Sequence, residues 1–131
     1  MVQPSGTSSD PIYESDAPEV SGGLSTYRNI NLGTTGVSVK AAAGQVYGWY
    51  LFNNAASARY VRLYDKATAP TVGADTPKMT IAIPPSSAAN VSIVGGIAFA
   101  NGIGIGASTL VADNDSTAPA SNDVVVNVFY K

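Results

Sequence analysis

The chain of 131 residues contains no cysteine and no histidine. Without cysteine it can form no disulfide, no thiolate metal site and no cysteine nucleophile. Without histidine it has no imidazole general base, no serine–histidine–aspartate triad and no imidazole zinc ligand. We therefore expect a protein that is not an enzyme, with no catalytic residues, no bound cofactor and no metal site.

Charged residues are also scarce, at 12% of the chain, about half the usual share of a soluble domain. The first 24 residues carry four acidic side chains and no basic one, at Asp10, Glu14, Asp16 and Glu19. The remainder carries seven basic residues against five acidic ones, a small and scattered excess of two positive charges. Proteins that bind nucleic acids usually show a clustered basic face, so we expect no nucleic-acid partner.

Long apolar runs are missing too. No stretch of 18 apolar residues is present to cross a membrane, so we expect no membrane partner. The first 20 residues, MVQPSGTSSDPIYESDAPEV, lack the basic segment followed by an apolar segment that marks a secretory signal. The sequence therefore predicts synthesis in a cytoplasm, with export only as part of a larger particle.

Residues 1–24 differ in composition from the rest of the chain. They contain three prolines, the four acidic residues and a closing Ser-Gly-Gly, which together cannot bury enough apolar surface to offset the entropy of ordering. We expect an extended N-terminal arm at 1–24 and one domain at 25–131. Ile12 and Tyr13 are the only sizeable adjacent apolar pair of the arm, and they could insert into a groove on a neighbouring molecule. The alternative is a tail without a partner.

From residue 25 onward, short β-branched or aromatic runs alternate with Gly, Asn, Pro and Asp. This pattern predicts about eight strands and no convincing helix, at 26–32, 36–42, 45–53, 58–66, 78–83, 90–94, 97–108 and 123–130. Asn101-Gly102 is a turn dipeptide that could divide 97–108 into two strands. The expected fold is all-β, a β-sandwich of the jelly-roll or Greek-key kind, with 67–77 crossing between the sheets.

The stretch GWYLFNNAASARYVRLYDK, residues 48–66, is expected to form a hairpin with large apolar side chains on both faces. In its second strand Val61 and Leu63 point one way, whereas Tyr60, Arg62 and Tyr64 point the other. Tyrosine and arginine are enriched at protein–protein contacts, so one face is expected to form the core and the other to be covered by a partner. The expected interface residues are Ile12, Tyr13, Tyr47, Trp49, Tyr60, Arg62 and Tyr64. Alternatively a loop or the arm covers the tyrosines, or they are simply exposed.

Three motifs invite a chemical interpretation. GIGIGA, residues 102–107, fits the glycine pattern of dinucleotide-binding loops, but no strand–helix context surrounds it. Asp113 and Asp115 begin a segment like a calcium loop, which then lacks the required glycine and glutamate, so a tight turn is the simpler interpretation and a bound cation the open alternative. A pair of facing carboxylates could hydrolyse a glycoside, but only five acidic residues lie beyond the arm and no two of them are marked as partners.

Several short segments resemble small structural proteins of tailed bacteriophages and prophages. They are VYGWYLFNN, ARYVRLYDKATAPTVGADTP, GGIAFANGIGIGAS, the DND turn and the terminal VNVFYK, within residues 41–131. The resemblance is closest to capsid decoration, or cement, proteins. It implies a homotrimeric β-sandwich that binds the major capsid protein on the outside of the head and stabilises the virion, with assembly in the host cytoplasm. The alternative is a module of the tail fibre or baseplate, or one that binds host glycans.

Overall fold

A computed structural model describes residues 22–131, which form eight β-strands and no helix. The strands are β1 (Ser25–Asn29), β2 (Val37–Lys40), β3 (Gly44–Asn53), β4 (Arg59–Tyr64), β5 (Met79–Ile83), β6 (Ser87–Phe99), β7 (Ile103–Ser108) and β8 (Val124–Tyr130). The expected all-β class is confirmed. Most of the expected arm, with Ile12 and Tyr13, lies outside the described residues. Within 22–131 there is no helix of the length and apolarity that crossing a membrane requires.

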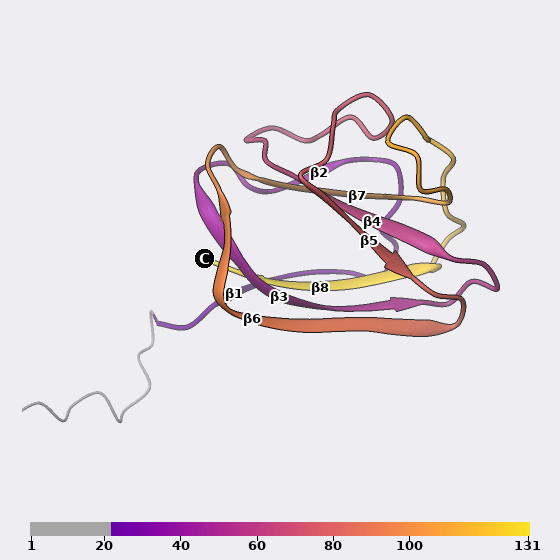
Figure 1. Cartoon of the computed structure of the whole chain (residues 1–131), viewed down its shortest axis with the longest axis horizontal. Helices are drawn as coiled ribbons and strands as arrows, with labels where there is room; N and C mark the ends of the chain where they lie inside the picture. Colours follow the sequence, from indigo (N-terminus) through magenta and orange to yellow (C-terminus); the bar gives the residue numbers. More distant parts are fainter. Residues whose placement is uncertain (1–21) are drawn as a thin grey trace, which may run out of the picture.

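The eight strands form two antiparallel sheets of four strands each, in the orders β1-β8-β3-β6 and β2-β7-β4-β5. Figure 1 shows them as a lower and an upper layer, so the expected β-sandwich is confirmed. Their inner faces enclose one hydrophobic core. Its fully buried members come from both layers and include Val46, Leu51, Val61, Leu63, Ile83, Phe99, Ile103, Ile105, Val124, Val126 and Val128.

The last strand of the chain, β8, is a central strand of its sheet. β8 lies between β1 and β3, and its residues alternate between buried and half-buried positions. Val124, Val126 and Val128 are buried in the core, whereas the intervening residues lie on the outer side of the sheet. The two-residue period of a strand therefore decides which of these side chains are buried.

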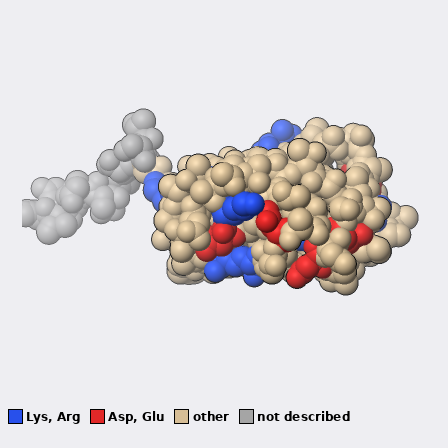
Figure 2. Space-filling model, turned by 90° about the horizontal axis from the view of Figure 1, so that it is seen from above, with Lys and Arg blue, Asp and Glu red and all other residues tan. Residues whose placement is uncertain are grey.

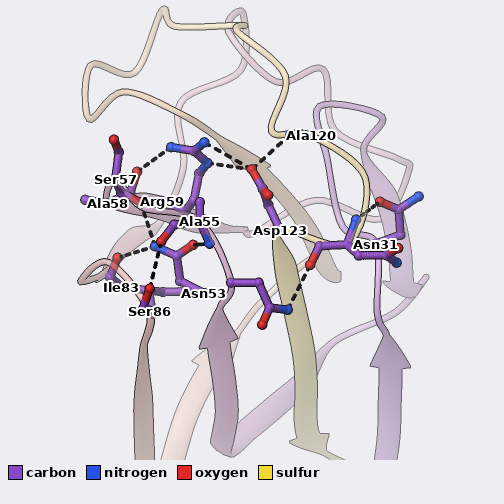
Figure 3. Close-up of polar contacts among 12 residues, drawn as sticks. Asn31, Asn53, Ala55, Ser57, Ala58, Arg59, Ile83, Ser86, Ala120 and Asp123 are labelled. Atoms are coloured by element: carbon purple, nitrogen blue, oxygen red, sulfur yellow. Dashed lines mark hydrogen bonds and ion pairs between the residues drawn. The ribbon is translucent and has the colours of Figure 1, made fainter.

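The prediction that residues 48–66 form a hairpin is wrong. β3 pairs with β6 and β8, whereas β4 lies in the other sheet and pairs with β5 and β7. Residues 54–58 are therefore a corner between the layers. The buried amide of Asn53 stabilises this corner. Its nitrogen donates to the carbonyl oxygens of Ser57 and Ile83, and its oxygen accepts from the N–H of Ala55 (Figure 3). The same nitrogen also donates to the carbonyl oxygen of Pro84.

The long segment 67–77 was expected to cross between the sheets, and this prediction is also wrong. It joins β4 to β5, which are antiparallel neighbours in the same sheet. The Asn101-Gly102 turn does divide 97–108, but it crosses between the layers instead of closing a hairpin. Residues 97–99 are the end of β6, which also contains the predicted strand 90–94, so the expected break between these two strands is wrong. Asp65 supports this crossing, because its carboxylate accepts hydrogen bonds from the backbone N–H groups of residues 100–102.

A β-bulge at Tyr47 changes which side chains of β3 face the core. Against β8, Val46 pairs with Tyr130 and Gly48 with Phe129, so Tyr47 is an extra residue without a direct partner. Val46 and Trp49 consequently both point inward, although strict alternation would put them on opposite sides. Simple parity along 46–52 would group Val46 with Tyr50 and Phe52, and the bulge is the reason that this grouping fails.

Candidate interaction surface

The outer side of the β2-β7-β4-β5 sheet is covered by the protein's own loops. As expected, Val61 and Leu63 point into the core and Arg62 and Tyr64 point outward, yet Arg62 is 0% and Tyr64 only 1% exposed. Figure 1 shows the loops 65–78 and 109–123 gathered around this layer. The prediction that Arg62 and Tyr64 form an exposed interface is therefore wrong, and the alternative, that a loop covers the tyrosine, is confirmed for Tyr64.

Arg62 holds the loop 109–119 against the sheet. Its Nη1 donates to the carbonyl oxygen of Asp115 at 3.0 Å, and its Nη2 donates to those of Leu110 and Ala112 at 2.8 and 2.5 Å. Its Nε and the hydroxyl of Tyr64 are buried without a partner among the described residues. Burial raises the pKa of Tyr64 and outweighs the lowering effect of Arg62. A buried cation that binds three carbonyls of one loop fixes the path of that loop.

The glycines of GIGIGA make room for the other covering loop. The inward positions Ile103 and Ile105 lie in the core, and the outward positions are Gly104 and Gly106. A Cβ at Gly104 would lie 2.9 Å from the ring of Pro70, and one at Gly106 would lie 2.4 Å from a methyl group of Val72. Pro70 and Val72 are themselves buried, so the loop 65–78 packs directly on the strand. The motif therefore serves packing, as its lack of a strand–helix context indicates.

The outer side of the β1-β8-β3-β6 sheet has no such cover among the described residues. Tyr50 is 55% and Phe52 39% exposed, and the ring of Phe129 contacts that of Tyr50. We call this side the aromatic face. The strand registers place these outward residues side by side: Thr26, Arg28, Tyr50, Phe52, Ala88, Asn90, Ser92, Val125, Asn127 and Phe129.

The aromatic face is nearly free of charge, since Arg28 is the one charged side chain among its ten residues. The loop-covered side is different. Figure 2 views the molecule from that side and shows basic and acidic side chains interspersed there, and one pair, Lys66 and Asp75, forms an ion pair of 2.7 Å. Depletion of charge together with aromatic enrichment is typical of the centre of a protein–protein interface.

The remaining expected interface residues do not gather on one surface. Trp49 is 6% exposed and belongs to the core, so the prediction that it is exposed is wrong. Tyr47 and Tyr60 are half-buried and come from different sheets. The structure instead brings together Tyr50, Phe52 and Phe129, which the sequence interpretation missed. Their alternation with buried neighbours in β3 and β8 was the available signal, but the bulge at Tyr47 hid which side faced outward.

The carboxylates of the described residues mostly serve their own loops. The N–H groups of residues 101, 100 and 102 lower the pKa of Asp65, and the Lys66 ammonium lowers that of Asp75. For Asp115, burial opposes the charge, but hydrogen bonds from Thr117 and Leu110 prevail and lower the pKa. Asp115 thus closes a tight turn. In residues 22–131 no three acidic side chains are grouped so that they could hold a metal ion.

Asp123 supports the end of the sandwich where the chain turns between the sheets. Arg59 forms an ion pair with it at 3.0 Å, and the N–H of Ala120 donates to the same carboxylate oxygen at 3.0 Å (Figure 3). Both side chains of the pair are largely buried, at 16% and 14% exposure. The pair therefore links β4 to the start of β8, and through them one sheet to the other.

A small polar hollow of about 380 Å³ lies beside the segment that leaves β1. Its polar lining comes from amides and hydroxyls, at Asn29, Asn31, Thr34, Thr35 and Ser121. The oxygen of Asn29 accepts from the N–H of Asn31, and the oxygen of Asn31 accepts from the N–H of Asn122. The lining contains no aromatic and no charged side chain. It could hold a small hydroxylated ligand but offers no stacking platform.

Comparison of the chain with models of protein families, with curated proteins and with solved structures found no match. The interpretation of function therefore rests on the geometry of the two outer faces.

Proposed function

We propose that this protein is a structural component of a bacteriophage virion, a decoration protein that binds the outside of the head through its aromatic face. One observation carries the proposal: within residues 22–131, loops cover one outer face of the sandwich, whereas the other outer face is exposed, aromatic and nearly uncharged. Soluble monomers rarely leave such a continuous patch open, so it is best explained as a site for a permanent neighbour.

The strand order supports the finer part of the proposal, that the sandwich is a jelly roll. A sheet ordered β1-β8-β3-β6 facing one ordered β2-β7-β4-β5 is the arrangement that results when a long antiparallel ribbon is wrapped into two layers. Jelly rolls are frequent among viral capsid domains. The same architecture also occurs in unrelated proteins, so it agrees with the proposed function without carrying it.

The proposed mechanism is stabilisation by mass action. A subunit that binds the assembled lattice of the major capsid protein, and not its separated subunits, stabilises that lattice by its binding free energy. Tyr50, Phe52 and Phe129 are the side chains suited to act as anchors, because large aromatic groups dominate the energetics of interfaces. Residues 1–24 precede β1, the edge strand of the sheet that carries the aromatic face. An arm that starts there is well placed to reach a neighbouring subunit.

The second candidate is a module of the tail that binds host glycans. It is favoured by the polar hollow beside β1 and by the exposed ring of Tyr50, since sugars bind through hydrogen bonds to amides and hydroxyls and through stacking on aromatic rings. The location of binding separates the two candidates. A decoration protein binds expanded heads that lack it, whereas a tail module binds tails or host cells.

The decisive experiment uses expanded heads of the parent phage that lack the protein, to which the full chain is added back. Replacing Tyr50 and Phe129 together with serine should weaken binding by at least a hundredfold, because two central anchors are lost. The matched control replaces Leu110 and Val111 with serine, two residues that are 59% and 61% exposed in the loop 109–119. This control should bind as the wild type does.

Binding by both variants with the affinity of the wild type would contradict the role of the aromatic face. Failure of the wild-type protein to bind such heads, together with binding to tails or cells, would replace the proposal by the second candidate.

A further inference from the structure

β6 forms one edge of the β1-β8-β3-β6 sheet and pairs with β3 alone among the described strands. Its part from Ser87 to Ser92 runs beside β3 without interruption, opposite Asn53 to Gly48. Because an antiparallel strand alternates the direction of its hydrogen bonds, every second residue of this segment points its N–H and C=O groups away from the sheet. These groups are a template for a further strand.

The edge lacks most of the devices that usually prevent such pairing. The 13 residues of β6 include no charged residue and no proline. The other three edges are short and carry a cation or a proline nearby: β1 has 5 residues with Arg28, β2 has 4 with Lys40, and β5 has 5 and follows Pro77-Lys78. Natural proteins protect edge strands by shortness, by charge and by proline. β6 uses only one device, the bulge at 93–96 where its register against β3 shifts.

We propose that two copies of this chain associate by antiparallel pairing of their β6 strands through residues 88–92, with Asn90 opposite Asn90 of the second copy. The two sheets would join into one of eight strands about a two-fold axis. An antiparallel strand pair is self-complementary about such an axis, so an identical edge satisfies the pairing pattern. Identical edges bring like charges together wherever a charge is present, and this edge has none. The side chains that meet are small or of medium size and all uncharged, at Ala88, Ala89, Asn90, Val91 and Ser92.

Asn90 supports the choice of a second copy as the partner. Its side-chain oxygen accepts a hydrogen bond of 3.1 Å from the N–H of Leu51, which fixes the amide beside the strand. Its side-chain nitrogen donates to none of the described residues, and the residue is exposed on the aromatic face. In a two-fold pair the corresponding amide of the other copy lies close by, so the free donors acquire an acceptor at the new seam.

The pairing goes beyond the proposed function, because it needs no capsid. It would place two aromatic faces side by side on one continuous sheet, with Tyr50 of each copy in the strand next to the seam. This arrangement predicts a dimer, whereas the resemblance to decoration proteins implies a trimer.

The test is analytical ultracentrifugation of the full chain over a range of concentrations. We expect a reversible dimer for the wild type. Asn90→Asp retains the oxygen that accepts from Leu51 but brings two carboxylates together at the seam, so the dissociation constant should rise at least tenfold. High salt should recover part of this loss because it screens the repulsion. The control Asn114→Asp makes the same change in the exposed loop 109–119 and should leave the dimer unchanged.

A wild type that stays monomeric or forms a trimer would overturn the pairing, as would a dimer that Asn90→Asp leaves intact. Hydrogen exchange gives a second measurement, since the outward amides of 88–92 should be protected in the wild-type dimer and should lose this protection on dilution. Failure of the β6 pairing is distinguishable from failure of the proposed function, because the latter is measured by head binding of the Tyr50 and Phe129 variant.

Discussion

The rings of Tyr50 and Phe129 meet edge to face on the outer side of the β1-β8-β3-β6 sheet, with their centroids 5.0 Å apart and their planes at 85°. They come from adjacent strands, and Phe129 stands opposite Gly48, which has no side chain to separate the rings. The pair thus orders the centre of the aromatic face. Its geometry is the one that aromatic rings prefer, since the positive edge of one ring faces the negative face of the other.

The contact between these rings should contribute little to folding. In a double-mutant cycle with Tyr50→Ala and Phe129→Ala, we expect a coupling of about 0.5–1 kcal/mol in the free energy of unfolding. The value is small because the exposed rings stabilise the fold mainly through their contact with each other. Urea denaturation of the four proteins measures this value. A coupling of zero would show that the rings do not touch in solution, and a double variant that fails to fold would show that the face belongs to the core.

Arg62 should be essential for the loop 109–119. Arg62→Leu removes the donor to three carbonyls, and we expect a loss of about 3 kcal/mol in stability because these groups become unsatisfied. The loop should also become sensitive to proteases. As a comparison, Lys66→Leu removes the more exposed ion pair with Asp75 and should cost at most about 1 kcal/mol. Equal stability of the two variants would contradict the anchoring role of Arg62.

Gly106 tests how closely the loop 65–78 packs on β7. In Gly106→Ala the new methyl group would lie 2.4 Å from Val72, so we expect a cost of about 1–3 kcal/mol in stability. Combining it with Val72→Ala should cost less than the sum of the two single changes, because the clash is removed. Gly33→Ala is the control, since no atom lies within 4 Å of its added carbon. Additive costs would show that the loop moves away without penalty.

The dependence of stability on pH should be confined to acid. The folded state lowers the pKa of Asp65, Asp75 and Asp115, so each favours folding at a pH above its unfolded pKa, which is about 3.9. This contribution disappears as the pH falls from that value through the lower folded pKa. With no histidine present, the thermal midpoint should be nearly constant between about pH 5 and 8 and should decrease below about pH 4.

Asp65→Asn isolates one of these contributions. It removes the charge that accepts from the three N–H groups of the turn at 100–102, so its acid transition should be shallower than that of the wild type. An unchanged acid transition would show that this carboxylate is not stabilised in the folded state.

Local sequence determined where the strands are and much of what each strand buries. Six of the eight predicted runs correspond to single strands, β1–β5 and β8, whereas β6 spans the predicted run 90–94 and the start of 97–108. The alternation in 124–130 predicts its buried valines, because a strand has a period of two and its neighbours need not be known. The glycines at 104 and 106 were also correctly read as part of a strand. These are properties of segments of fewer than ten residues.

The tertiary structure decided which strands pair and which surfaces remain open. β3 and β4 are adjacent in sequence but lie in different sheets. The corner between them is stabilised by hydrogen bonds from the Asn53 side-chain amide to the carbonyl oxygens of residues 57, 83 and 84. The extra residue at the bulge, Tyr47, changes which side chains of β3 after it point into the core and which point outward. Arginine is a residue type typical of interfaces, yet Arg62 is covered by the loop 109–119, which follows it in the chain by about 50 residues. Burial depends on contacts between distant segments, and local periodicity contains no information about them.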